Sequence, residues 1–146
     1  MLTDTGGRLL KAHAHPANEH DRWGGKVLLE GLDLSLWPRV RKVFVDWAYR
    51  GLRGEAEGLG LELEVVAHPH AGVRGVWVRE GEALPEVERV KGFQPLPKRW
   101  VVERTFAWLG RNRRLGKDYE YHPEVTEAWM YLAMIRLLLK RLARAA

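Results

Sequence analysis

The segment from residue 97 to residue 120, PKRWVVERTFAWLGRNRRLGKDYE, constrains the fold of this 146-residue chain more than any other segment. A helix through it has two distinct faces when each residue turns by about 100°. An apolar stripe of Val102, Phe106 and Leu109 is expected to face the core. The adjoining face carries one acid, Glu103, together with Arg99, Gly110 and Arg114. This face indicates either a surface ion pair between Arg99 and Glu103 or a carboxylate serving a metal- and phosphate-handling site.

The order of strand and helix patterns predicts one α/β domain covering residues 1–146. Apolar runs bounded by Gly or Pro, and one alternating run, predict strands at residues 9–15, 40–45 and 61–67. Capping and periodicity predict helices at residues 21–31, from Pro97 onward and at 123–143. The Gly- and Pro-punctuated stretch at 71–92 is expected to be a loop or insert.

Large apolar side chains of the two C-terminal helices are expected in the core. In the last helix these are Val125, Trp129, Leu132, Leu139 and Leu142. Trp100 and Trp108 are assigned to packing in the same way. Trp47 stands beside Asp46 and is the tryptophan that would be tested for contact with DNA.

Positive charge is concentrated at the C-terminal end of the chain. Residues 91–146 hold 12 Lys or Arg against 5 Asp or Glu, whereas residues 1–90 hold 12 against 14. This asymmetry indicates either a nucleic-acid-binding face or a solvated helix surface. On the first interpretation, the residues that contact phosphates are Arg104, Arg111, Arg113, Arg114 and Lys117.

The composition of the chain limits the cellular compartment and the kinds of metal site that can be expected. The chain has no cysteine, which excludes disulfides and thiolate metal sites. Arg136 interrupts the longest apolar run, so no membrane-spanning segment is expected. No apolar signal sequence stands at the N-terminus, and a cytoplasmic protein without a membrane partner is therefore expected.

Four segments of the chain carry a resemblance to a known family. They are RWVVERTFAWLGRNRRLGKDYE, EAWMYLAMIRLLLKRL, HPANEHDRWGG (15–25) and VFVDWAYRG (43–51). Together they resemble the C-terminal part of the catalytic domain of DDE transposases of bacterial insertion sequences. The resemblance covers nearly the whole chain and weakens between residues 71 and 90. It implies a partial RNase H-like fold, a mixed sheet flanked by helices with its N-terminal strands missing.

The resemblance also implies which residues act. Asp46 matches the second catalytic acid of the family and Glu103 matches the third, so both are expected to ligate Mg²⁺ or Mn²⁺. Arg99 matches a basic residue four places before the Glu. A basic residue is expected seven places after the Glu, but that position is Gly110, with Arg111 one step later.

The first catalytic Asp of the family lies upstream of the segment that corresponds to residues 2–5 here, so the resemblance implies that this polypeptide lacks it. We therefore expect a transposase chain, truncated or derived by frameshifting, that does not cleave DNA alone. The missing strands leave sheet edges open. Three explanations are considered. An upstream-encoded polypeptide supplies the missing strands, two copies pair their open sheet edges as a homodimer, or the chain is a decayed remnant.

Two other functions are considered. A non-catalytic regulatory fragment would bind transposon DNA or the full-length transposase. A metal-binding module would use the pairs His13/His15 and His68/His70, since alternate residues of a strand share one face and imidazole binds zinc. The other interpretation of these histidines is that they stand at strand ends and in loops.

Overall fold

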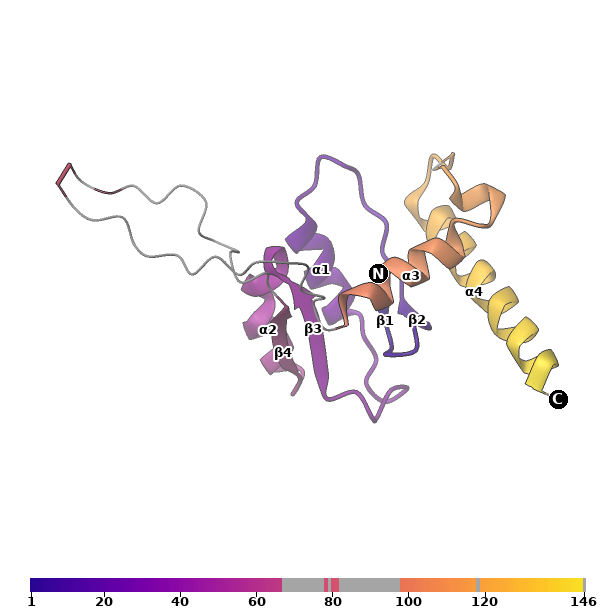
Figure 1. The fold of residues 1–146 in the computed structure, drawn as a ribbon, viewed down its shortest axis with the longest axis horizontal. Helices are drawn as coiled ribbons and strands as arrows, with labels where there is room; N and C mark the ends of the chain where they lie inside the picture. The colour runs from indigo at the N-terminus through magenta and orange to yellow at the C-terminus, as the bar shows by residue number, and fades with distance from the viewer. Residues whose placement is uncertain (67–77, 79, 82–97, 118, 146) are drawn as a thin grey trace.

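A computed structural model describes residues 1–66, 78, 80–81, 98–117 and 119–145 (Figure 1). The loop or insert predicted at 71–92 lies almost wholly outside these residues, and so does the pair His68/His70. Within the described part of the chain, no helix is long and apolar enough to cross a membrane.

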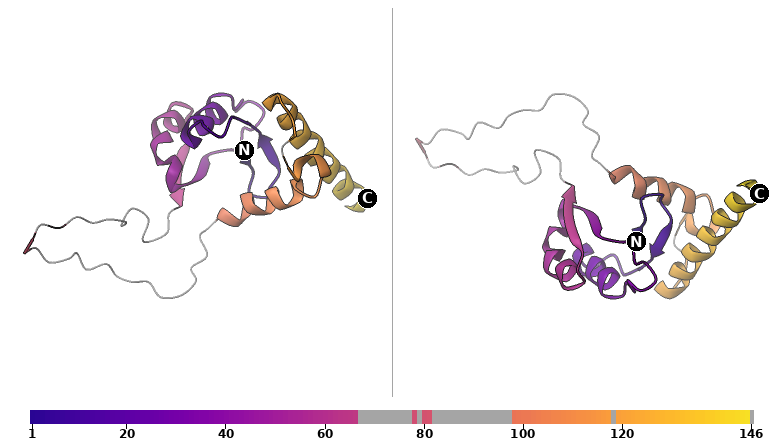
Figure 2. Two further views of the ribbon diagram at one scale, coloured as in Figure 1. Left: turned by 90° about the horizontal axis from the view of Figure 1, so that it is seen from above. Right: turned by 90° about the horizontal axis from the view of Figure 1, so that it is seen from below.

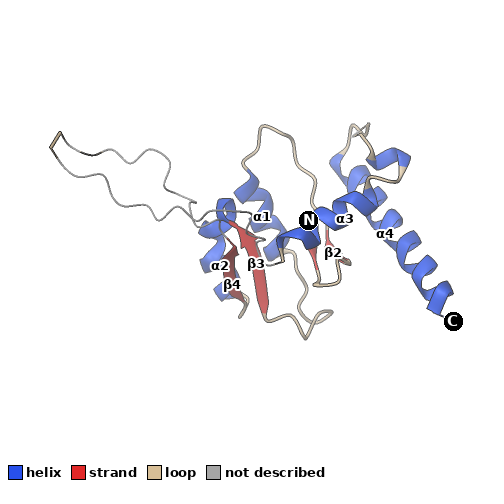
Figure 3. Cartoon of the chain, viewed as in Figure 1, coloured by secondary structure: helices blue, strands red, loops and turns tan. Residues whose placement is uncertain are grey.

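The described residues form a mixed α/β structure, as the sequence predicted (Figure 3). The strands are β1 (Leu2–Thr3), β2 (Leu9–Lys11), β3 (Lys42–Asp46) and β4 (Glu62–Val66). The α-helices are α1 (Asp21–Glu30), α2 (Arg53–Gly58), α3 (Arg99–Leu109) and α4 (Pro123–Ala145), and the 3₁₀ helices are η1 (Trp47–Leu52) and η2 (Arg113–Leu115). The sequence patterns predicted neither β1 nor the two helical segments η1 and α2.

The strands form two separate ladders. β1 pairs antiparallel with β2, and β3 pairs parallel with β4 so that Lys42 lies opposite Glu62 and Asp46 opposite Val66. The order across the molecule is β4, β3, β1, β2 (Figures 1 and 2). β3 and β1 are neighbours in this order, but they do not pair with each other.

The first hydrophobic core lies between the β3–β4 ladder and the helices α1, η1 and α2. It contains Leu29, Leu32, Val43, Leu52, Ala56, Leu61 and Leu63. At the start of the ladder, Lys42 Nζ lies 2.8 Å from a carboxylate oxygen of Glu62 and 2.9 Å from one of Glu64. The hydrogen bonds to these two carboxylates raise the pKa of Lys42.

The second core joins β2 to α3 and α4. Its buried members are Leu9, Ala12, Leu109 and Met134. The backbone N–H of Ala12 donates to the hydroxyl of Tyr131 at 2.9 Å, which ties the end of β2 to α4. The helices α3 and α4 therefore pack on the N-terminal hairpin (Figure 2).

The prediction for the buried face of α3 was right for Leu109 and wrong for Val102 and Phe106. Val101, Thr105 and Leu109 are buried, whereas Val102 is exposed and Phe106 is 55% exposed. The Thr105 hydroxyl lies 2.9 Å from the carbonyl oxygens of both Gly7 and Val101, which satisfies it inside the core. The apolar pattern of the sequence did not predict this buried face, because the residue at its centre, Thr105, is polar.

The prediction for α4 was wrong for four of its five residues, and the fifth, Trp129, is half-buried. Val125, Leu132, Leu139 and Leu142 were expected in the core, but all four are exposed. The face of α4 that packs inward instead carries Met130, Ala133, Met134, Leu137 and Leu138. The helix thus has apolar side chains on two opposite faces, and the sequence pattern alone does not say which one is buried.

Candidate functional site

Asp46 is the last residue of β3 and the N-cap of η1. Its Oδ1 accepts a hydrogen bond of 2.9 Å from the backbone N–H of Ala48, and its side chain is exposed. Asp46 therefore caps η1, and it uses one of its two carboxylate oxygens to do so. The position at the carboxyl end of a parallel strand is also where α/β proteins gather ligands.

The residues after Asp46 are packed against α1. Arg22 Nη2 donates to the carbonyl oxygen of Gly51 at 2.9 Å, and a Cβ atom added at Gly51 would lie 2.6 Å from Arg22 Cζ. Burial raises the pKa of Tyr49, and the charges of Asp21 and Asp46 add to this shift. The segments 15–25 and 43–51, which are distant in sequence, therefore meet at Tyr49 and Gly51, in the helix η1 that follows Asp46.

Trp47 is 41% exposed beside Asp46. The guanidinium of Arg50 lies 4.7 Å from the Trp47 ring, and Arg50 also donates to the Trp47 carbonyl oxygen at 3.1 Å. This cation–π pair lies within η1, the helix that directly follows Asp46.

Glu103 lies on the exposed side of α3, and Arg99 is the first residue of that helix. The side chain of Arg99 lies outside what the structure describes. α3 packs against β1 and α4, so Glu103 is held by a different part of the molecule from Asp46. Within the described residues, no three side chains of His, Asp or Glu gather as a metal-binding group.

Arg104 is built into the packing of α3. Its guanidinium lies 4.2 Å from the ring of Trp100 and 4.7 Å from the ring of Trp108, and Arg141 of α4 lies 4.2 Å from the Trp108 ring. Its Nε is buried and makes no hydrogen bond with the described residues. Arg104 therefore packs against two indole rings, those of Trp100 and Trp108.

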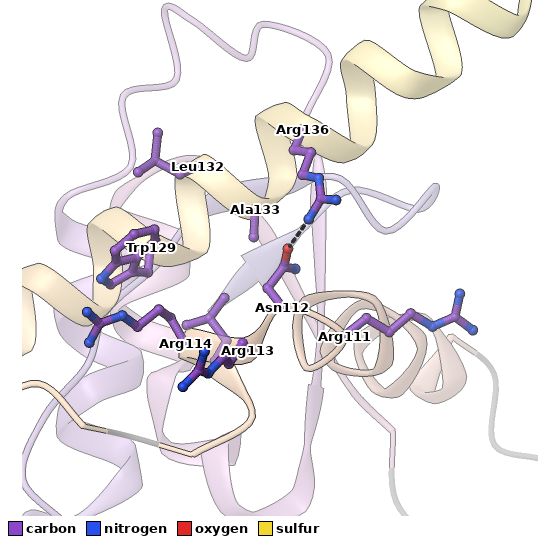
Figure 4. A pocket seen from close by; sticks show the side chains of 9 residues that line it. Arg111, Asn112, Arg113, Arg114, Trp129, Leu132, Ala133 and Arg136 are labelled. Carbon is purple, nitrogen blue, oxygen red and sulfur yellow. Dashed lines mark hydrogen bonds between the residues drawn. The ribbon is translucent and has the colours of Figure 1, made fainter.

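An open pocket of about 470 Å³ lies between α4 and the loop that contains η2 (Figure 4). It is lined by Arg111, Asn112, Arg113, Arg114, Leu115, Trp129, Leu132, Ala133 and Arg136. Three of the five residues predicted to bind DNA are thus brought to one place. Lys117 is exposed and does not line the pocket, and Arg104 lies in the stack described above.

Polar contacts organise the walls of this pocket. Arg136 Nη1 donates to Asn112 Oδ1 at 3.3 Å, and Arg114 Nη1 lies 3.3 Å from Glu120 Oε1. Figure 4 shows Arg114 beside Trp129, with its guanidinium 5.7 Å from the ring. Sequence reasoning did not assign Arg136 and Trp129 to this site. The signal for Arg136 was its position as the one charge within an apolar helical run.

The pair His13/His15 lies in the segment that follows β2, with ring centroids 5.8 Å apart. His13 Nδ1 lies 3.1 Å from Glu127 Oε1, and the N–H of Ala14 donates to the same oxygen at 2.8 Å. These contacts fasten the chain after β2 to α4. They support the structural interpretation of His13.

Comparison with known proteins places the chain in a family. The model of the transposase DDE domain matches residues 1–138, and the chain therefore belongs to that family. Its function is accordingly that of a transposase domain, in DNA transposition and recombination. Neither the curated proteins nor the solved structures gave a match.

Proposed function

We propose that this chain is the C-terminal portion of a DDE transposase catalytic domain with an RNase H-like fold. It acts in metal-dependent phosphodiester cleavage and strand transfer. The observation that carries the proposal is Asp46, an exposed acid at the carboxyl end of a parallel strand, directly before the helix η1 where two segments resembling the family meet.

In this proposal Asp46 and Glu103 bind Mg²⁺ or Mn²⁺, and Arg99 orients a phosphate. Both acids are exposed, and carboxylate oxygens are the ligands these hard cations prefer. The Ala48 N–H engages one oxygen of Asp46, and the other oxygen is the proposed ligand. When bound, the ion stabilises negative charge on the phosphate and on the attacking and leaving oxygens.

The strand order supports completion of the sheet by a second polypeptide. β3 and β1 are neighbours without a common ladder, and each ladder has only two strands. Two-stranded ladders are marginal by themselves, and a strand between β1 and β3 would join them into one five-stranded sheet. We propose that this strand, and a third carboxylate, come from an upstream-encoded polypeptide.

A cleavage assay tests this function. Mn²⁺-dependent nicking of transposon-end DNA would be measured with this chain alone, with the upstream-encoded polypeptide, and with a Glu103→Gln variant in the same mixture. We expect nicking in the mixture and its loss with Glu103→Gln. Strong nicking by the chain alone would contradict the need for a partner. An inactive mixture would favour the alternative of a regulatory fragment that binds DNA without cleaving it.

The pocket between η2 and α4 is the proposed DNA contact. Guanidinium groups bind phosphates and release counterions, so removing two of them weakens binding and its salt dependence together. For the double variant Arg111→Gln, Arg113→Gln, we expect the slope of log K against log salt to become shallower by about 1–2. Fluorescence anisotropy with labelled duplex at several salt concentrations measures this slope.

The control for that measurement is Arg39→Gln, because Arg39 is exposed and lies in the loop before β3, outside the pocket. Its effect on the slope is expected to be less than about half a unit, as for a charge that touches no phosphate. An effect of Arg39→Gln half as large as that of the double variant would show that binding follows net charge and not the pocket, because the control removes one charge and the double variant removes two.

A further inference from the structure

Glu120 is bonded to two residues that line the pocket between η2 and α4. It lies in the segment that joins these two helices, and its side chain is only 19% exposed. Its Oε1 accepts hydrogen bonds from Arg114 Nη1 at 3.3 Å and from Trp129 Nε1 at 3.1 Å. One donor comes from η2 and the other from α4. A single carboxylate oxygen therefore engages two sides of a pocket whose lining carries four arginines.

The arginines that line this pocket differ in their partners. Arg136 donates to a neutral amide oxygen, and Arg114 is paired with the carboxylate of Glu120. Within the described part of the chain, neither Arg111 nor Arg113 forms an ion pair. Arg113 and Arg114 are adjacent in η2 and both are exposed (Figure 4). They form a natural pair for comparison, because only one of them has an acid beside it.

A carboxylate and a phosphate bind a guanidinium group in the same way. Both present anionic oxygens to the same N–H donors, so they compete for them. A phosphate that approaches Arg114 also meets the negative charge of Glu120. Arg114 is 58% exposed, and ion pairs of exposed arginines are weak because water and salt screen them. A DNA phosphate can therefore displace Glu120 from Arg114, but at a loss of affinity.

The bond to Trp129 keeps the competing carboxylate in place. The indole N–H is a neutral donor, so salt screens its hydrogen bond to Glu120 less than it screens the ion pair. The guanidinium of Arg114 lies 5.7 Å from the ring of the same tryptophan. Glu120 is thus held beside Arg114 by a residue that is itself part of the pocket.

We propose that Glu120 competes with DNA phosphate for Arg114 and thereby lowers the affinity of the pocket for DNA. This inference rests on the proposed DNA contact, and it names the residue that limits that contact. In the free chain Arg114 already has an anionic partner, whereas Arg111 and Arg113 meet phosphates without one. The pocket therefore binds DNA less tightly than its number of cations predicts.

Glu120→Gln tests the competition, because glutamine keeps an oxygen that can accept from Trp129 but carries no charge. Fluorescence anisotropy with labelled duplex measures the result. We expect the affinity to rise about 3- to 5-fold, and the slope of log K against log salt to steepen by about 1, since Arg114 then neutralises one more phosphate. The matched control is Glu124→Gln, which removes an exposed acid outside the pocket and should change the affinity by less than about 2-fold.

A gain of affinity separates competition from a structural role, since loss of a merely structural contact would weaken binding. Adding Arg114→Gln to Glu120→Gln should cancel the gain. Circular dichroism should show unchanged helix content in each variant. The competition would be overturned by an unchanged or lower affinity of Glu120→Gln, or by an equal gain in Glu124→Gln.

The natural chain provides a second test, which does not depend on any change at Glu120. Arg113→Gln should weaken duplex binding at least about 3-fold, whereas Arg114→Gln should weaken it by less than about 2-fold. Equal losses from these two variants would overturn this inference alone. No binding of duplex by any of the chains would overturn the proposed DNA contact together with it.

Discussion

Asp46→Asn is expected to abolish metal-dependent DNA cleavage while leaving the protein as stable as before. Asparagine keeps the Oδ1 acceptor for the Ala48 N–H and is as good an N-cap as aspartate. It removes the negative charge that would hold Mg²⁺ or Mn²⁺, so cleavage in the mixture with the upstream-encoded polypeptide should fall by at least about 100-fold. Nicking rate and thermal unfolding of the same preparation measure the two effects.

Asp46→Ala is the companion variant, because it removes both the charge and the cap. We expect the same loss of cleavage together with about 1 kcal/mol lower free energy of unfolding. If Asp46→Asn cleaves DNA at the rate of the natural chain, the carboxylate is only a helix cap and the catalytic assignment is wrong. Glu103→Gln should match Asp46→Asn in cleavage, because both acids are proposed to bind the same ions.

Gly7→Ala is expected to give the largest loss of stability among single small substitutions. Gly7 has φ +79°, and a Cβ atom there would lie 2.8 Å from Thr105 Oγ1 and 3.0 Å from Trp108 Cζ3. Both neighbours belong to α3, and Thr105 is fully buried with its hydroxyl bonded to the Gly7 carbonyl. Left-handed strain and overpacking together should cost about 3 kcal/mol, lowering Tm by roughly 10 °C.

Gly60→Ala separates the two costs. Gly60 also has a positive φ, +71°, but an added Cβ would meet no atom within 4 Å. The substitution should therefore cost only the backbone term, about 1–2 kcal/mol. Urea unfolding of the two variants measures the difference. Equal losses would mean that the hairpin between β1 and β2 does not depend on its close approach to α3.

Local patterns in the sequence predicted most of the elements. The helix at 21–31 was observed as α1, ended by Gly31, and the strands at 40–45 and 61–67 were observed as β3 and β4 within two residues. The predicted strand at 9–15 was shortened to β2, because the chain after Lys11 bonds to α4 through Glu127 and Tyr131. The resemblance to DDE transposases was confirmed by the family match.

Catalytic assignments to Asp46, Glu103 and Arg99 stay predictions, and so do the DNA contacts. Sequence placed Asp46 correctly at the end of a strand, and it identified three arginines that the fold brings to one pocket. It did not find Arg136 and Trp129, which enter that pocket from α4. Residues of separate elements come together in a pocket only when those elements pack against each other. The sequence pattern of a single helix does not predict that packing.

Sequence by itself determined which segments are helical or extended, where the positive charge lies, and to which family the chain belongs. Helices and strands can be predicted in this way because periodicity and capping depend only on residues that are close together in the sequence. Only the tertiary structure decided which side of α3 and α4 is buried. On α3 the buried face includes Thr105, whose hydroxyl finds the Gly7 carbonyl. On α4 there are two apolar faces. Contacts with β2 and α3 bury the face that carries Met134 and leave the face with Leu132 and Leu139 exposed.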